Sequence, residues 1–374
     1  MNIGIVSVWW NRGQGTVARH LRSIFDALGH RTFILARPSR GFAGAENRIA
    51  TTDVWNQRDV THASTFVVPR DEYFTWARAT GVEAMFFDMN FQFDEIEALK
   101  DSGIRTVGRF VWETFGEEHV TGAKRAFSVI YSLTRCEQAR YSRLGIESPR
   151  LQWGCHPELL AVSPRKHGDG IYFFAPVSYQ GRRKPLRSIV EAFKRVNDPR
   201  LRLIIKAQGS RRTTEEVDFR SDPRIRRITE DCSTDEYQRL FSSCHVCLAP
   251  SRWEGLGLHL YEATAFGMPI ITNDIPPMNE IVRDDYNGRL VRSIPAGQAQ
   301  SGIPAYDPEP ESLREAIESL SRAENIERMS QNTIRYRESL SWLQTSRQFA
   351  QLLARAFGPG PSPGTELTGE ILES

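Results

Sequence analysis

Two carboxylates and two glycines stand together in residues 250–262, which read PSRWEGLGLHLYE. Glu254 comes before the glycines, Glu262 follows them, and a helical pattern begins at Leu258. The N-terminus of a helix beside Gly257 offers free backbone N–H groups and a positive dipole end, which suit a phosphate group. With an acid on each side, one carboxylate can bind sugar hydroxyls and the other a ribose diol. The segment therefore predicts a nucleotide-sugar site, although two glutamates at this spacing also occur by chance on solvated helix faces.

The flanking residues extend this pattern and argue against a chance occurrence of the two glutamates. VCLAPS precedes it at 246–251, and AFGMPIIT follows at 265–272. The whole string resembles the donor-binding motif of glycosyltransferase family 4, the retaining enzymes with the two-domain GT-B fold. Other segments resemble family motifs in the expected order: NRGQGT at 11–16, ALGH at 27–30, KPLRSIVEAF at 184–193, the segment 225–241, and SLSW at 339–342.

The resemblance implies a role for each of these residues. Glu262 would bind the ribose hydroxyls, and Glu254 would hold the donor sugar and stabilise charge near the anomeric carbon. Lys184, with Arg183 beside it, would contact the diphosphate, so that no metal and no cofactor are expected. The implied catalytic residues are Glu254, Lys184 and Arg183, and the implied donor-binding residues are Glu262, Gly255, Leu256, Gly257, Leu258, Gly15, Thr229 and Asp231.

The chain also departs from the family pattern. Ser178 stands where many members carry an arginine about six positions before the lysine, and Pro276-Pro277 replaces a glycine pair. The histidine that many members have in the N-terminal domain has no counterpart here. Asp88, Asn90 or Glu113 can face the sugar or acceptor instead, with Gly13 on the same side, and the sequence does not choose among them.

The expected reaction is retaining, hexosyltransferase-like transfer of a sugar from a UDP- or GDP-sugar to a hydroxyl acceptor, which is a glycan, a lipid-linked glycan or a small molecule. An epimerase or phosphorylase of the same fold is the main alternative. A transferase acting on modified DNA and a noncatalytic nucleotide-sugar-binding module are lesser ones. Residues 1–40 hold six arginines and one acid, which suggests an anionic acceptor or a peripheral membrane contact: Arg12, Arg19, Arg22, Arg31, Arg37 and Arg40.

Alternating strands and helices must position these residues, so the fold class is α/β with two Rossmann-like parallel-sheet domains. By the resemblance these domains face a central cleft, and a C-terminal helix crosses back to the N-terminal domain. The expected segments are an acceptor-side domain at 1–162, a linker at 163–170, a nucleotide-sugar domain at 171–338, a crossover helix at 339–357 and a disordered tail at 358–374. Expected strands include 3–8, 32–36, 84–87, 106–110, 171–175, 201–206, 246–249 and 269–272, and expected helices include 93–101, 136–144, 234–242 and 258–266.

Composition excludes several other classes. With 374 residues, of which 40% are hydrophobic and 25% charged, the chain can form ordinary globular cores. No apolar run reaches the roughly 18–20 residues needed to cross a bilayer, and five cysteines indicate a cytoplasmic setting. A net charge of +2 does not favour DNA as a binding partner. Cys244 and Cys247 have the spacing of half a zinc site, but no second pair occurs, so we interpret them as core residues.

Overall fold

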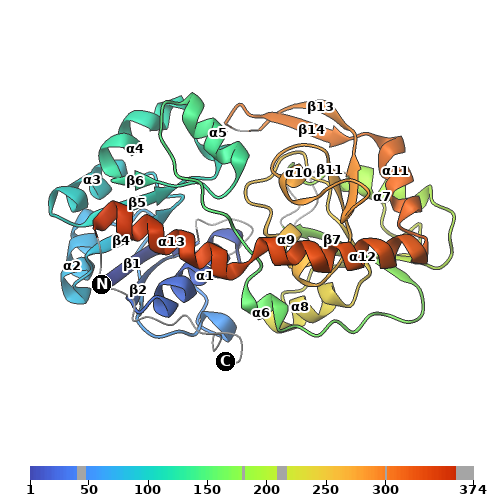
Figure 1. Cartoon of the computed structure of the whole chain (residues 1–374), viewed down its shortest axis with the longest axis horizontal. Coiled ribbons are helices and arrows are strands. Elements are labelled where there is room, and N and C mark those ends of the chain that lie inside the picture. The colour runs from blue at the N-terminus through green and yellow to red at the C-terminus, as the bar shows by residue number, and fades with distance from the viewer. Residues whose placement is uncertain (40–47, 179–181, 209–216, 300, 359–374) are drawn as a thin grey trace. The chain divides into compact units, whose positions relative to one another are not determined.

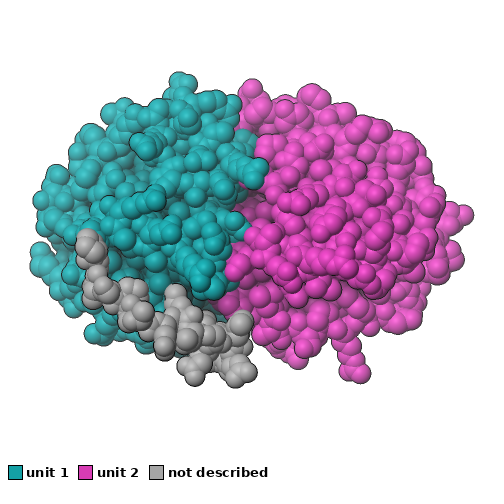
Figure 2. Space-filling view, viewed as in Figure 1, with its two compact units in different colours: residues 1–153, 342–374 teal, residues 154–341 magenta. Residues whose placement is uncertain are grey.

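The computed structural model describes residues 1–39, 48–178, 182–208, 217–299 and 301–358. The chain forms two compact units (Figures 1 and 2). The first contains Met1–Trp153 together with the chain from Trp342 onward, and the second contains Gly154–Ser341. The expected disordered tail lies outside the described residues, except for Gly358. Within the described residues, no helix combines the length and the apolar character that a membrane span requires.

The first unit is built on a six-stranded parallel sheet with the order β3-β2-β1-β4-β5-β6. Strand β1 is apolar and almost wholly buried, as expected for a central strand covered on both faces. The strands are β1 (Asn2–Val8), β2 (Arg31–Arg37), β3 (Val60–His62), β4 (Ala84–Asp88), β5 (Arg105–Arg109) and β6 (Val129–Ile130). The helices include α1 (Gly13–Ala27), α2 (Arg70–Thr80), α3 (Phe93–Asp101), α4 (Val120–Ala126), α5 (Arg135–Arg143) and α13 (Trp342–Phe357).

The second unit has another six-stranded parallel sheet, with the order β12-β11-β10-β7-β8-β9. Its core packs the apolar face of α7 and α11 on the sheet. The strands are β7 (Ile171–Ser178), β8 (Leu201–Ala207), β9 (Ile225–Ile228), β10 (Val246–Leu248), β11 (Ile270–Asn273) and β12 (Gly288–Val291). The helices are α6 (Pro157–Leu160), α7 (Leu186–Lys194), α8 (Thr234–Ser242), α9 (Leu258–Ala265), α10 (Met278–Ile281), α11 (Pro310–Ser319) and α12 (Ala323–Arg337).

Several elements were not expected from the sequence, among them α2, β3 and a hairpin. Helix α2 buries only Tyr73, Trp76 and Ala77, so its apolar periodicity is weak. The short strand β3 has two exposed residues out of three and carries no strand pattern. An antiparallel hairpin, β13 (Ser293–Gln298) and β14 (Pro304–Pro308), contains prolines and glycine and shows no clean alternation of apolar and polar residues.

The boundary between the units differs from the expected one. It falls at Trp153, ahead of the expected linker 163–170, and that segment lies inside the second unit. The reason is a series of contacts that attach the segment to the second unit. Lys166 Nζ donates to the carbonyl oxygens of Ser242 and Cys244 at 3.0 and 2.6 Å. Further upstream, the Cys155 N–H donates to the Leu340 carbonyl at 2.8 Å.

The C-terminal helix returns to the first unit. A short 3₁₀ turn at Glu338–Leu340 precedes it, so the helix begins at Trp342 and not at the expected residue 339. Its Phe349 ring lies 6.0 Å from the ring of Phe25 in α1 and 5.5 Å from that of Tyr131. Figure 1 shows this helix in red over the blue helix α1.

Candidate functional site

The loop after β10 and the start of α9 carry the central motif. Gly257 has φ +73° and is the N-cap of α9, a left-handed conformation that residues with a β-carbon rarely adopt. Among the described residues, no side chain caps this helix end, and its first turn holds no acid. The Leu260 N–H donates to the Gly257 carbonyl at 2.8 Å. The N–H groups of Leu258 and His259 are the ones left for a ligand at this helix start, where the positive end of the helix dipole favours an anion.

Lys184 and Glu254 form a buried ion pair beside this helix end. Lys184 Nζ lies 2.6 Å from Glu254 Oε1, although the residues are 70 positions apart. Both side chains are at most 5% exposed. Ser251 joins the pair, because its hydroxyl accepts from Lys184 Nζ at 2.5 Å and donates to Glu254 Oε1 at 3.0 Å. Arg183 Nη1 lies 3.8 Å from the other carboxylate oxygen, Oε2.

These positive charges determine the ionisation of Glu254. Burial opposes the charged form, but Arg183 and Lys184 outweigh it and hold the pKa of Glu254 well below its usual range. The carboxylate is therefore ionised at neutral pH. A buried carboxylate of fixed charge and orientation can stabilise positive charge that develops near it.

Two residues of this cluster were missed by the sequence reasoning as functional side chains. Ser251 is anchored by its own N–H, which donates to Asn273 Oδ1 at 3.1 Å. His259, the second residue of α9, places Nε2 at 3.9 Å from Glu254 Oε1. A polar residue in the otherwise apolar run LGLHLY was a usable signal for His259, whereas only the three-dimensional structure brings Ser251 to Lys184.

Glu262 lies on the same helix and has a different environment. The Tyr237 hydroxyl, from α8, donates to Glu262 Oε2 at 3.3 Å. Burial raises the pKa of Glu262 to about 7, against the effect of this hydrogen bond. Burial raises the pKa of the Cys247 thiol in β10, while Lys184 lowers this pKa and Glu262 raises it further. Cys244 and Cys247 are free, buried cysteines, which agrees with their interpretation as core residues.

Apart from Gly15, which lies in the first unit, the other residues expected to bind the donor lie in the second unit. Gly255 and Leu256 are buried in the loop before Gly257. Thr229 follows β9, and its N–H donates to the neighbouring Glu230 side chain at 3.0 Å. Lys206 Nζ donates to the Glu230 carbonyl at 2.7 Å and so attaches the segment before Asp231 to β8.

In the first unit, Asp88 is the last residue of β4 and is buried with Arg109. Arg109 Nη1 lies 3.4 Å from Asp88 Oδ1, and Arg109 Nη2 lies 3.2 Å from Glu137 Oε1. Burial, opposed by Arg109, raises the pKa of Asp88 to about 6. Asp88 Oδ2 is buried and has no hydrogen-bond partner in the part of the chain that the structure describes.

The remaining candidates of the first unit have other surroundings. The Asn90 amide donates to the Tyr73 hydroxyl at 2.9 Å and accepts from the Gln92 N–H at 3.1 Å, so it is held inside the fold. Glu113 lies in a short 3₁₀ turn, Trp112–Thr114. Gly13 is the first residue of α1. A β-carbon at Gly15 would overlap the Trp10 carbonyl oxygen, which explains this glycine by packing alone.

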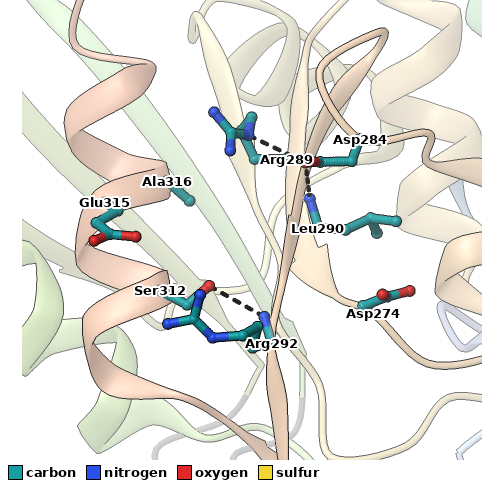
Figure 3. A pocket seen from close by; sticks show the side chains of 8 residues that line it. All are labelled: Asp274, Asp284, Arg289, Leu290, Arg292, Ser312, Glu315 and Ala316. Atoms are coloured by element: carbon teal, nitrogen blue, oxygen red, sulfur yellow. Dashed lines mark hydrogen bonds and ion pairs between the residues drawn. The ribbon is translucent and has the colours of Figure 1, made fainter.

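A separate pocket of about 300 Å³ lies between β12 and α11 (Figure 3). Its charged residues are partly paired, since Arg289 Nε lies 3.1 Å from Asp284 Oδ1. None of the residues that were expected to bind the donor lines it. The lining residues are Asp274, Asp284, Arg289, Leu290, Arg292, Ser312, Glu315 and Ala316.

Comparison with known proteins places a family match on the second unit. Residues 169–320 match the family model described as Glycosyl transferases group 1. A 56-residue segment, 15% of the chain, is 39% identical to an uncharacterized 41.2 kDa protein in the cps region of Klebsiella pneumoniae. That match spans only 16% of the Klebsiella protein's length.

Solved structures resemble the chain over nearly its full length. Sucrose-phosphate synthase from Thermosynechococcus elongatus has a TM-score of 0.71 at 14% identity, covering 96% of this chain and 99% of that one. Anabaena Alr3699/HepE in complex with UDP and glucose has a TM-score of 0.65 at 12% identity, covering 95% and 100%. At these identities the likeness shows the fold, which is GT-B, as expected from the sequence. Together with the match of residues 169–320, this fold supports a GT-B glycosyltransferase.

Proposed function

We propose that the chain is a retaining glycosyltransferase that moves a sugar from a UDP- or GDP-sugar to a hydroxyl acceptor. The observation that carries the proposal is the buried Lys184–Glu254 pair beside the uncapped N-terminus of α9. A diphosphate and a sugar need these groups together: positive charge for the phosphates, and an ionised carboxylate for the sugar. The UDP and glucose bound to Alr3699/HepE add support for a nucleotide-sugar donor.

Each side chain has a proposed task. The backbone N–H groups after Gly257, with Lys184 and Arg183, bind the diphosphate and stabilise it as it leaves. Glu254 binds the donor sugar and stabilises positive charge near the anomeric carbon. Glu262 accepts hydrogen bonds from the ribose hydroxyls, while Gly255, Leu256 and Leu258 shape the loop around the donor. Thr229 and Asp231 bind near the base through backbone contacts.

We also propose that the reaction needs no metal and no enzyme nucleophile. Lys184, Arg183 and the helix end supply the positive charge that a metal ion would otherwise provide. The departing phosphate oxygen accepts the proton of the acceptor hydroxyl as the new glycosidic bond forms on the same face of the sugar. The bond from the anomeric carbon to the phosphate oxygen breaks, and the bond to the acceptor oxygen forms on that same face, so the anomeric configuration is retained.

On the first unit, Asp88 is the best supported of the three candidates for the sugar or acceptor side. It stands at the carboxyl end of a parallel strand, where open α/β sheets bind ligands. Its Oδ2 atom is buried without a partner among the described residues, whereas the Asn90 side chain is satisfied internally. A hydroxyl of the substrate can donate to this oxygen. Of the six arginines in residues 1–40, Arg19, Arg22 and Arg37 are buried, and Arg40 lies outside the described residues. An anionic acceptor or a peripheral membrane contact of the first unit stays a proposal.

A donor screen tests the proposed function. The purified chain is incubated with UDP- and GDP-sugars, with and without candidate acceptors, and nucleotide release and product mass are measured. We expect nucleotide release that depends on an acceptor, with a product heavier by one sugar. Conversion of the nucleotide-sugar without any acceptor would instead support an epimerase, and binding without turnover would support a noncatalytic module.

A further inference from the structure

The side chain of His259 has no assigned task in the function proposed above. We propose that His259 is a positioning residue. When the diphosphate of a nucleotide-sugar attracts Lys184 away from Glu254, the imidazole N–H of His259 donates a hydrogen bond to the Glu254 carboxylate in place of Lys184. This inference rests on the proposed function, because it assumes that the diphosphate and Glu254 compete for Lys184.

The geometry places three donor groups around one oxygen atom. Glu254 Oε1 has Lys184 Nζ at 2.6 Å, Ser251 Oγ at 3.0 Å and His259 Nε2 at 3.9 Å. The first two are hydrogen bonds, and the third is just beyond that range. A movement of about 1 Å brings Nε2 to hydrogen-bond distance. Because His259 is the second residue of α9, its backbone is fixed and a side-chain rotation is sufficient.

The Nε2 atom of His259 lies near Glu254 but is too far from it for a hydrogen bond. It is buried, and among the described residues it has no hydrogen-bond partner. Buried polar atoms without a partner are rare in folded proteins, because they lose their hydrogen bonds to water without replacement. A partner that arrives only in the ligand-bound state explains this atom.

The charge of His259 makes it suited to this exchange. Burial and the neighbouring Lys184 lower the pKa of His259 to about 3, while Glu254 acts in the opposite direction and Arg183 adds to the lowering. The imidazole is therefore neutral at working pH and carries a single N–H. A neutral donor orients the carboxylate without cancelling its negative charge. In contrast, Lys184 neutralises Glu254 as long as the two remain paired, so the exchange leaves the carboxylate more effective at the anomeric carbon.

Three variants test the inference in the full-length chain. His259→Leu removes the N–H, and His259→Gln replaces it with an amide N–H. His245→Leu is the matched control, because His245 is also a partly buried histidine whose pKa is lowered, to about 4, mainly by burial. It accepts from the Tyr172 N–H at 3.0 Å and has no part in the proposed site.

We expect His259→Leu to bind UDP with unchanged affinity but to lower kcat by roughly tenfold to 10²-fold, the cost of a misplaced catalytic group. His259→Gln should restore most of kcat, and His245→Leu should keep the wild-type kcat. The kcat of the wild type and of His259→Gln should follow pH in parallel between pH 6 and 8. An unchanged kcat in His259→Leu would overturn the inference, as would loss of UDP affinity, which would indicate direct contact with the ligand.

A binding measurement separates this inference from the proposed function. In the chain labelled with ¹⁵N-histidine, addition of UDP should shift the Nε2–H signal of His259 downfield as its hydrogen bond to Glu254 forms. A signal that stays in place while UDP binds would contradict the exchange, whatever the reaction is. Failure of every nucleotide to bind would count against the proposed function and the inference together.

Discussion

At the scale of single residues, the two glutamates of the motif differ in their protonation. Arg183 and Lys184 keep Glu254 ionised, whereas burial raises the pKa of Glu262 to about 7. Two carboxylates eight positions apart therefore have separate chemistry: a fixed negative charge at one end and a group that titrates near neutral pH at the other.

Glu262→Ala should weaken UDP or GDP binding, because the ribose hydroxyls lose their acceptor. The expected loss is about 1.5–3 kcal/mol, roughly ten- to a hundredfold in affinity. Since the carboxyl group of Glu262 gains a proton below pH 7, its contribution should grow as the pH rises from 6 to 8. Calorimetry of the wild type and Glu262→Gln at both pH values isolates the contribution of the Glu262 charge, because titration of the nucleotide phosphate affects the binding to both proteins equally. An equal pH dependence in the two would remove Glu262 from the site.

Glu254→Gln keeps the shape of the side chain and removes its charge. Nucleotide affinity should stay within a few-fold of the wild type, while turnover falls by roughly 10²–10³, the range seen when one electrostatic stabiliser is lost. Steady-state kinetics with a saturating donor measure this effect. A fully active Glu254→Gln enzyme would leave the assignment of this carboxylate without support.

At the scale of elements, the start of α9 depends on the backbone of Gly257. Gly257→Ala forces a β-carbon into a left-handed conformation, at a cost of about 1–2 kcal/mol. The added atom would also lie 3.1 Å from the Leu260 side chain. Gly297→Ala in β13 is the matched control, because Gly297 has φ +88° and no neighbour within 4 Å of the added atom. Both variants should lose stability in thermal unfolding, but only Gly257→Ala should weaken UDP binding. Equal UDP affinity in the two would argue against a phosphate at this helix end.

Elements with strong local signals could be predicted from the sequence. Helix α8 has the expected bounds because Ser233 and Glu236 form a capping box at its start. Helix α2 lacks such a signal and buries few side chains, so it was missed. The hairpin β13–β14 was missed for a similar reason, since its pairing joins residues whose pattern is not that of a strand.

The candidate site shows the same division between local and long-range information. The order of Glu254, Gly257 and Glu262 is local, and the sequence was sufficient to single it out. The contact of Lys184 with Glu254 joins residues 70 positions apart and depends on how β7 and β10 pair. Resemblance alone implied a phosphate contact for Lys184, so the ion pair itself was not anticipated.

At the scale of the whole molecule, the two units have the same plan, a six-stranded parallel sheet covered by helices. The C-terminal helix belongs to the first unit, so the residues of that unit come from both ends of the chain. The expected linker 163–170, a polar, glycine-containing stretch, lies inside the second unit. Contacts such as those of Lys166 with the Ser242 and Cys244 carbonyls show why it belongs to the second unit.

Removal of divalent metals tests the charge assignment for the enzyme as a whole. If Lys184, Arg183 and the end of α9 balance the diphosphate, EDTA should leave the rate of transfer unchanged. Lys184→Ala should lower that rate by roughly 10²-fold or more, because a buried stabiliser of the leaving group is lost. Strict dependence on magnesium or manganese, restored after EDTA treatment by adding the metal, would contradict this assignment.

The anomeric configuration of the product tests the central claim most directly. An α-linked UDP- or GDP-sugar that passes the donor screen is incubated with its acceptor, and the new linkage is followed by proton NMR from the first turnovers. The small coupling constant of an α-linked anomeric proton should persist in the product of a gluco- or galacto-configured sugar, because attack and departure occur on the same face. A β-linked first product would show inversion and would contradict the proposed mechanism and the roles assigned to Glu254 and Lys184.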